Sequence, residues 1–348
     1  MFARLIAALV LVTLGLSVPV FYFTLRKDGG GCPEETLVVA IPRGAGTLRA
    51  LDLLRDRHLI ANRWTALAYL RCVFPGKPLQ AGEYGFDKTM GPREVLLKLI
   101  RGEVLLHSVT FPEGRTSFEY ARILEKAGIC SAGDFLAVLR DTTPAPSMHV
   151  SGGTLEGLLY PDTYHFPKMY PPKRIVRAIL DRFERIAASR REELRRQSLD
   201  PYAWVTLASI VEREARVSDE KPVIAGVFFN RLAAGMPLQA DPCVLYALEM
   251  RGARVDRLTH ADLQLDSKYN TYRYGGLPPG PIGNPGLEAL DAVLHPRKHH
   301  YLYFVARSDG THAFAVTLAD HLRNIARSRR LDPLPHVRIN SKSDSLPH

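Results

Sequence analysis

The chain has 348 residues, a formal net charge of +10 at pH 7 and 46% hydrophobic residues. This length and mixed composition are typical of a globular protein with two or three domains. The positive charge is spread along the chain, and no segment interleaves basic and aromatic residues, so the composition argues against a nucleic-acid partner.

The first element is an apolar run without charged residues, Leu5 to Leu25. At about 1.5 Å per residue it is long enough to cross a bilayer core of about 30 Å, so it predicts a membrane helix within residues 1–27. A cleaved signal peptide is the alternative, but the run is longer than is usual for such peptides and no clear cleavage site follows it. The flanking charges, Arg4 before the run and Arg26 and Lys27 after it, leave the orientation open.

Flexible segments are predicted next to the anchor and at the far end of the chain. Residues 28–36 include three consecutive glycines and are typical of a linker. Residues 331–348 combine prolines, serines and charges, as a frayed tail does. Neither segment is expected to carry chemistry.

An internal repeat organises the first half of the chain. Val39–Leu59 and Val109–Ile129 align without gaps at an offset of 70 residues, and each copy predicts a strand, a Pro-x-Gly turn and a helix. Between the copies, Leu79–Tyr84 predicts a short strand and Pro92–Ile100 a helix that stops at Gly102. The repeat predicts small α/β modules with a boundary near residue 105.

Two helices are predicted in the second half. Arg174–Arg196 shows helical periodicity with basic residues on its outer face. Leu207–Ala215 (LASIVEREA) places Glu212 and Glu214 near opposite edges of an apolar helical stripe. A partly desolvated carboxyl there can act as a general acid, whereas the plainer interpretation is a solvated pair on the rim of the helix. Spacing alone does not choose between the two glutamates.

Three segments together contribute carboxylates, amides and tyrosines. Leu155–Pro167 has a loop composition, Val227–Pro242 predicts a helix end followed by a short extended piece, and Tyr269–Asn284 is too rich in glycine and proline for regular structure. Aromatic rings and amides together suit a sugar ligand, although each segment could equally be a structural loop. The polar residues of interest are Glu156, Asp162, Tyr160, Tyr164, Asn230, Gln239, Asp241, Asn270 and Tyr272.

The last predicted element is a hairpin, with a buried strand at Tyr301–Ala306 and its partner at Ala313–Val316. Neither the four cysteines nor the nearby histidines show the spacing of a metal or redox site, so no metal and no cofactor is expected. How the cysteines pair is left open.

The segments LEGLLYPDTYHFP, LASIVEREA, VFFNRLAAGMPLQADP, YNTYRYGGLPPGPI and YLYFVARSDGTHAFAVTLADH occur in the order and at about the separations found in the YceG-like (MltG) family of endolytic murein transglycosylases, which the chain resembles. The resemblance implies an α+β fold with an N-terminal transmembrane helix, small LysM-like α/β modules and a C-terminal mixed α/β catalytic domain. The expected ranges are 1–27 for the anchor with a cytoplasmic tip, 28–36 for the linker, 37–105 for the LysM-like module, 106–150 for a second small repeat, 151–330 for the catalytic domain and 331–348 for the tail.

The resemblance also implies a location and partners. The protein is expected to be a single-pass protein of the cytoplasmic (inner) membrane, with the catalytic domain on the periplasmic, extracytoplasmic side. There it would cleave peptidoglycan glycan strands as a lytic transglycosylase, a carbon-oxygen lyase, and terminate nascent strands. Peptidoglycan synthases (penicillin-binding proteins) are the expected protein partners.

The catalytic glutamate of the family matches Glu212, and Glu214 matches a position that is often acidic. Glu212 would protonate the oxygen between N-acetylmuramic acid (MurNAc) and N-acetylglucosamine (GlcNAc), and its carboxylate would then take the proton of the muramoyl C6 hydroxyl to give a 1,6-anhydro ring. Asp241 or Glu156 would support this step. The expected sugar contacts are Asn230, Gln239, Asn270 and Tyr272.

The chain departs from the family pattern at three positions. Ala240 and Cys243 replace two threonines, which puts a binding role there in doubt, and Tyr160 stands where phenylalanine is common. Two other functions stay open: a muramidase-type hydrolase, in which a carboxylate such as Asp241 activates water or attacks C1, and a catalytically silent peptidoglycan-binding scaffold.

Overall fold

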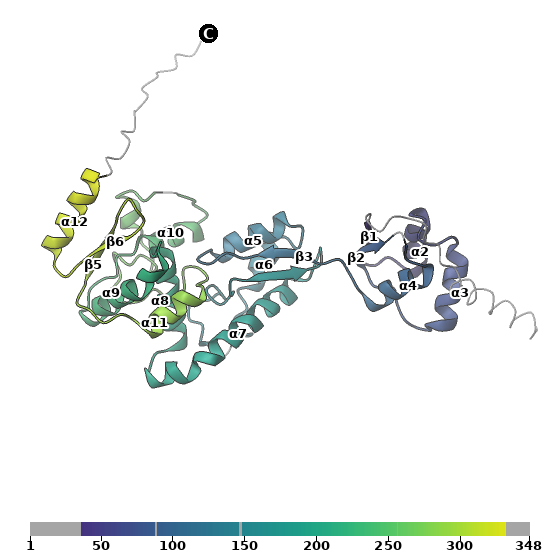
Figure 1. The fold of residues 1–348 in the computed structure, drawn as a ribbon, viewed down its shortest axis with the longest axis horizontal. Helices are drawn as coiled ribbons and strands as arrows, with labels where there is room; N and C mark the ends of the chain where they lie inside the picture. The colour runs from purple at the N-terminus through teal and green to yellow at the C-terminus, as the bar shows by residue number, and fades with distance from the viewer. Residues whose placement is uncertain (1–35, 88, 146–147, 256, 332–348) are drawn as a thin grey trace, which may run out of the picture. The chain divides into compact units, whose positions relative to one another are not determined.

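The computed structural model describes residues 36–87, 89–145, 148–255 and 257–331 (Figure 1). The expected anchor at Leu5–Leu25, the linker up to residue 35 and the tail from residue 332 lie outside these ranges. Among the helices of the described ranges, none is both long and apolar enough to cross a bilayer. The described residues form three two-stranded sheets and a larger set of helices, which is a mixed α/β architecture.

The chain divides into two compact units. Among the described residues, unit 1 comprises residues 36–87, 89–109, 123–131 and 163–172, and unit 2 comprises residues 110–122, 132–145, 148–162, 173–255 and 257–331. The second copy of the repeat is therefore divided between the units.

Unit 1 is built on an antiparallel pair of strands, β1 (Thr36–Ile41) and β2 (Gly82–Asp87). The strand predicted at Leu79–Tyr84 begins later, at Gly82, because Gln80 is hydrogen bonded instead to the end of the following helix, through its backbone N–H to Leu99 and its amide to Ile100. That helix, α4 (Pro92–Arg101), ends at Gly102 as predicted, with a φ of 66° that favours glycine. Helices α2 (Thr47–Asp56) and α3 (Arg63–Val73) complete the core.

Both copies of the repeat follow the same course. In the first, β1 leads through a turn at Gly44 (φ 77°) into α2; in the second, β3 (His107–Thr110) leads through Gly114 (φ 70°) into α5 (Ser117–Lys126). The sequence prediction of a loop over Leu155–Pro167 is wrong for its last part, because residues Thr163–Phe166 pair with β3 as strand β4.

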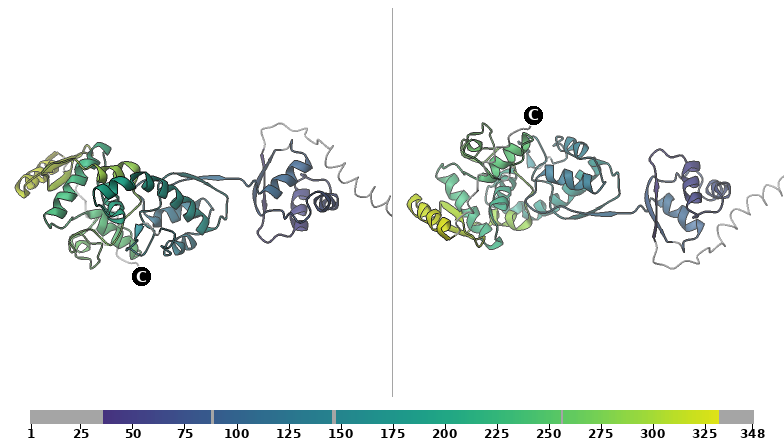
Figure 2. Two further views of the ribbon diagram at one scale, coloured as in Figure 1. Left: turned by 90° about the horizontal axis from the view of Figure 1, so that it is seen from below. Right: turned by 90° about the horizontal axis from the view of Figure 1, so that it is seen from above.

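Unit 2 contains most of the helices. Figure 2 shows this unit from two further sides, with the C-terminal hairpin and helix, in yellow, at one end of it. Its regular elements are α6 (Ala132–Val138), α7 (Pro172–Arg196), α8 (Pro201–Glu214), the 3-10 turn η2 (Ser218–Glu220), α9 (Lys221–Ala233), α10 (Asp241–Met250), the 3-10 turn η3 (Asp262–Gln264), α11 (Leu287–Leu294), β5 (Tyr303–Ala306), β6 (His312–Ala315) and α12 (Leu318–Leu331).

Helix α8 lies at the centre of unit 2 and packs against α9, α10 and α11. The predicted single apolar stripe is wrong, because every residue from Trp204 to Val211 is buried. The polar side chains in this stretch bond to backbone oxygens, Thr206 to Tyr202 at 2.8 Å and Ser209 to Thr206 at 2.7 Å, so their burial leaves no hydroxyl unpaired. The plainer interpretation, in which both glutamates lie on a solvated rim of the helix, is also wrong, because Glu212 follows directly on this buried stretch.

Four further sequence predictions are settled here. The predicted helix at Arg174–Arg196 is confirmed as α7, and Tyr269–Asn284 has no regular structure, as expected. The predicted extended piece at Asp241 is wrong, because Asp241 is the first residue of α10. The C-terminal hairpin is confirmed, but β5 starts at Tyr303 and is only partly buried, since hairpin and α12 lie at the end of the unit.

Candidate active site

Glu212 lies in the last turn of α8, where the buried part of the helix ends. Its side chain is 9% exposed, and its carboxylate lies 3.2 Å from the ammonium of Lys221. The backbone N–H of Gly286 donates to the same carboxylate at 3.1 Å. These partners come from α9 and from the start of α11, so the packing of three helices positions the group.

Lys221 is nearly as buried as Glu212, with 6% of its side chain exposed. The turn η2 reverses the chain after α8, which brings the first residue of α9 back beside Glu212. Lys221 also lies 3.3 Å from Glu288, which accepts a 2.6 Å hydrogen bond from Ser218. Burial disfavours the ammonium, but the charge of Glu212 and the hydrogen bonds to both glutamates outweigh it, so the pKa of Lys221 is raised.

Gly286 brings a second carboxyl group to the same place. A methyl group at Gly286 would collide with the carboxyl of Glu113, so the two carboxyls of Glu113 and Glu212 lie against one glycine. The turn that carries Glu113 is held by reciprocal backbone bonds, Gly114 donating to Asn284 at 2.8 Å and Asn284 donating to Arg115 at 3.0 Å. Partial burial of the carboxyl and then the charge of Glu212 raise the pKa of Glu113.

Glu212 and Glu113 line a cavity of about 320 Å³. The wall is strongly charged and contains several glutamates and arginines, which suits a polar ligand. Its lining residues are Glu113, Gly114, Arg115, Glu119, Glu212, Arg213, Leu245, Glu249, Ala253, Arg254 and Val255.

Glu214, Asp241 and Tyr272 form a separate group, none of them among the lining residues of that cavity. The hydroxyl of Tyr272 donates to Asp241 at 2.5 Å. Burial and then the charge of Asp241 raise the pKa of Glu214 to about 8. The two glutamates that the sequence left equivalent therefore have different surroundings: Glu212 faces a cation and an N–H, and Glu214 faces another carboxylate.

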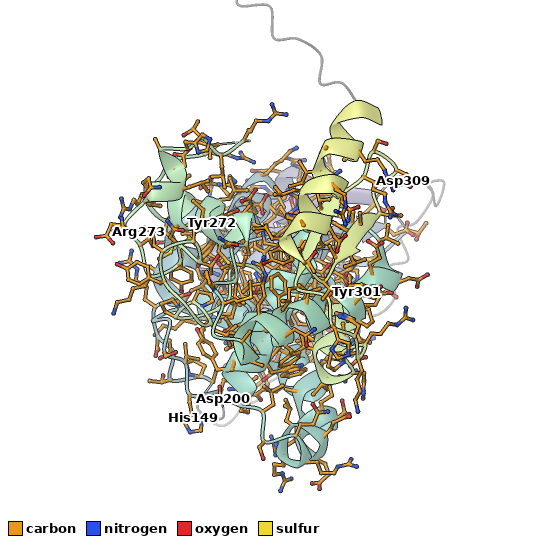
Figure 3. All side chains as sticks on the ribbon, turned by 90° about the vertical axis from the view of Figure 1, so that its left-hand side faces the viewer. His149, Asp200, Tyr272, Arg273, Tyr301 and Asp309 are labelled. Carbon is orange, nitrogen blue, oxygen red and sulfur yellow. The ribbon has the colours of Figure 1, made fainter. Side chains whose placement is uncertain are left out.

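Gln239 and Asn230 hold parts of unit 2 together. The side-chain oxygen of Gln239 accepts from Arg231 at 3.3 Å, and its own φ of 52° is a strained value for this residue. The amide of Asn230 donates to the backbone oxygens of His299 and Tyr301, at 2.9 and 3.0 Å. The backbone N–H of Gln239 donates to Thr271 at 3.1 Å, which places Gln239 beside the segment that carries Asn270 and Tyr272. Tyr301, to which Asn230 is bonded, lies at a different place on the unit from Tyr272 (Figure 3).

Asn270 is fully buried, and its amide donates to the backbone oxygens of Leu263 and Leu265. Ala240 and Cys243 are also buried, so the hydroxyls missing there would have pointed into the interior of the unit. Tyr160 is 8% exposed, and its ring lies under the guanidinium of Arg182.

Glu156 is a buried structural carboxyl. It accepts from the backbone N–H and hydroxyl of Ser117, from the amide of Asn284 at 2.9 Å and from the hydroxyl of Tyr246 at 3.3 Å. Since Asn284 also holds the turn beside Glu113, Glu156 supports the cavity from behind. Burial raises the pKa of Glu156 to about 7 in spite of these hydrogen bonds.

Glu156→Gln should reduce the dependence of stability on pH. The folded pKa lies above that of an ordinary glutamate, so the contribution of this carboxyl to stability is fully present below about pH 4.5 and is lost as pH rises towards 7. The free energy of unfolding in urea, measured at pH 5 and pH 8, should differ by about 2.5 kcal/mol less in the variant than in the wild type. Glu192→Gln, at an exposed position of α7, is the matched control; an equal pH difference in all three proteins would contradict the assignment.

Lys221, Glu113 and Gly286 were not singled out from the sequence. One signal for Glu113 was present, because the repeat aligns it with Arg43 in an otherwise similar Pro-x-Gly turn. Lys221 and Gly286 carried no signal, since both act through tertiary contacts. Within the described ranges, no group of three histidine, cysteine or acidic side chains is arranged to hold a metal ion.

Comparison with known proteins places the chain in a family. The model of the YceG-like family matches residues 39–327. An endolytic murein transglycosylase of Bacillus subtilis is 32% identical over 83% of this chain and 83% of its own length. One of Streptococcus pneumoniae is 30% identical over 84% of this chain, which spans only 58% of that longer protein. The crystal structure of a yceG-like protein from Listeria monocytogenes is 32% identical, with a TM-score of 0.56 over 83% of this chain and 99% of the other. The chain therefore belongs to the YceG-like family.

Proposed function

We propose that this protein is a lytic transglycosylase of peptidoglycan, which cleaves the bond between MurNAc and GlcNAc without water and leaves 1,6-anhydro ends. Its relatives in Bacillus subtilis and Streptococcus pneumoniae carry the name endolytic murein transglycosylase. The observation that carries the proposal is the position of Glu212, a nearly buried carboxyl that lines a polar cavity.

In this proposal Glu212 acts twice. It first donates a proton to the glycosidic oxygen, so the GlcNAc hydroxyl leaves as C1 of MurNAc becomes cationic. The resulting carboxylate then takes the proton of the C6 hydroxyl as that oxygen bonds to C1. The proton returns to Glu212 and no water is consumed. Lys221 and the N–H of Gly286 stabilise the carboxylate between the two steps.

The other predicted site residues take supporting roles in the proposal. Asp241 and Tyr272 form an exposed hydrogen-bonded pair beside Glu214 and suit a sugar contact outside the cavity. Asn230, Gln239 and Asn270 hold backbone or arginine partners and position the surrounding loops. Glu156 positions the turn of Glu113 through Asn284.

We further propose that Leu5–Leu25 anchors the chain in the cytoplasmic membrane, with unit 2 on the extracytoplasmic side. Peptidoglycan lies on that side, and an anchored enzyme meets strands close to the membrane, where synthases extend them. Residues 37–105 would serve as the LysM-like module that holds the glycan. These proposals rest on the apolar run and the family resemblance.

Product masses test the proposed function. The full chain in detergent is incubated with purified peptidoglycan, and the soluble fragments are weighed by mass spectrometry. Transglycosylation gives anhydro ends that are one water lighter than hydrolysed ends, whereas reducing ends would indicate a muramidase. Strands that are bound but remain uncut would support a scaffold and contradict the proposal.

A further inference from the structure

The contacts of Glu212 create a problem for its first step. Three features favour its negative charge: the ammonium of Lys221, the N–H of Gly286, and the N-terminal end of α11, where Gly286 is the N-cap. A general acid must instead begin the reaction with a proton. A nearby group that disfavours the negative charge of Glu212 is therefore needed.

Glu113 supplies that influence. Its carboxyl lies against the Gly286 that donates to Glu212, and both carboxyls line the same cavity. Two carboxyls against one glycine repel each other when both are charged, which disfavours ionisation of the pair as a whole. With one proton on the pair, its remaining charge balances that of Lys221.

We propose that Glu113 and Glu212 form a carboxyl pair that holds one proton at working pH, and that Glu113 is the positioning residue that keeps Glu212 able to donate it. The inference rests on the proposed function, because it assigns the state in which Glu212 begins the reaction. The raised pKa of Glu113, caused by partial burial and then by the charge of Glu212, agrees with the geometry.

The charges around the pair come from every element packed against it. From α11, Glu288 repels it and is itself held by Lys221 and Ser218. Other charged groups line the cavity, where Arg115 is paired with Glu119. These other lining groups are Arg115, Glu119, Arg213, Glu249 and Arg254.

A substitution at Gly286 tests the proposal in a second way. Its φ of −78° is accessible to alanine, but a β-carbon there would displace the carboxyl of Glu113, which is the flexible end of a side chain. Gly286→Ala should therefore move the carboxyl of Glu113 away from that of Glu212. It removes neither carboxyl, and it keeps the backbone N–H that donates to Glu212.

The test is the pH profile of anhydro-product formation by the full chain. In Glu113→Gln the second carboxyl of the pair is gone, so the alkaline limb of the activity profile should move to lower pH. Activity at pH 7.5 should fall about tenfold and recover as the pH is lowered. Gly286→Ala should shift the limb in the same direction, and the double variant should shift it no further. Glu192→Gln, which is exposed on α7, should match the wild type.

A readout without turnover makes the test independent of catalysis. In the full chain labelled with 13C at glutamate carboxyls, the wild-type pair should titrate in two separated steps, and Glu113→Gln should lose the upper one. An equal loss of activity at every pH, or an unchanged titration, would overturn the inference. Reducing ends from the wild type would instead refute only the transglycosylase, because a hydrolase also needs a protonated acid.

Discussion

Glu212→Gln should abolish the release of anhydro products, with a loss of about a thousandfold in kcat. Glutamine keeps the shape of the side chain and can still accept the N–H of Gly286 through its amide oxygen. It can neither donate the proton that the leaving oxygen needs nor take one from the C6 hydroxyl. Product release from purified peptidoglycan at saturating substrate, quantified by mass spectrometry, measures the loss.

Glu214→Gln is the matched control, since it changes a glutamate in the same turn of α8. At a pKa of about 8, Glu214 is mostly protonated at pH 7, and glutamine has the shape and neutral charge of a protonated carboxyl. We expect less than a tenfold change in kcat. If Glu214→Gln abolishes the reaction and Glu212→Gln retains it, the assignment of the two glutamates is reversed while the reaction class survives.

Local patterns predicted the elements that depend on local chemistry. The helix at Pro92–Ile100 was predictable because proline starts it and Gly102 ends it. The two strand–turn–helix copies were predictable because the glycines of both Pro-x-Gly turns adopt positive φ. Such signals lie within a few residues of the structure that they specify.

The burial of α8 could not be predicted from the sequence, because it depends on tertiary contacts. Periodicity gave α8 one buried face, but three helices cover it, and Thr206 and Ser209 are buried because the backbone satisfies their hydroxyls. Polar composition suggested that Asn230 and Asn270 face a sugar, yet both amides bond to backbone oxygens. Composition does not distinguish an amide that binds a ligand from one that holds a loop.

The candidate site also combines a residue that the sequence could indicate with residues that only the tertiary structure brings to it. Glu212 was reached through helical position and resemblance, because a carboxyl next to an apolar stretch can be read from the sequence. Lys221 reaches it only through the reversal at η2, and Glu113 only because Gly286, the N-cap of α11, has no side chain. The charges that control the proton of Glu212 are thus set by how four separate segments meet.

Lys221→Met should destabilise unit 2 strongly, because it removes the cation. Methionine keeps most of the apolar stem of the lysine side chain, so the loss is mainly that of the charge. Glu288 is 61% exposed and regains water, whereas Glu212 is 9% exposed and is left with the N–H of Gly286 and the repulsion of Glu113. Breaking a buried ion pair from one side typically costs about 3–5 kcal/mol. We expect a loss of this order in the free energy of urea unfolding at pH 8.

The same variant should change the pH profile in the opposite direction to Glu113→Gln. Without the ammonium, the pair keeps its proton to higher pH, so the alkaline limb of anhydro-product formation should move up. Lys221→Arg, which retains the charge, should recover most of the stability, and Glu288→Gln should cost less than about 1 kcal/mol because that end of the network is exposed. If Lys221→Met has wild-type stability and an unchanged alkaline limb, the ion pair between Lys221 and Glu212 contributes neither to stability nor to the pH profile. The negative charge of the carboxyl pair would then have to be balanced by a group other than Lys221.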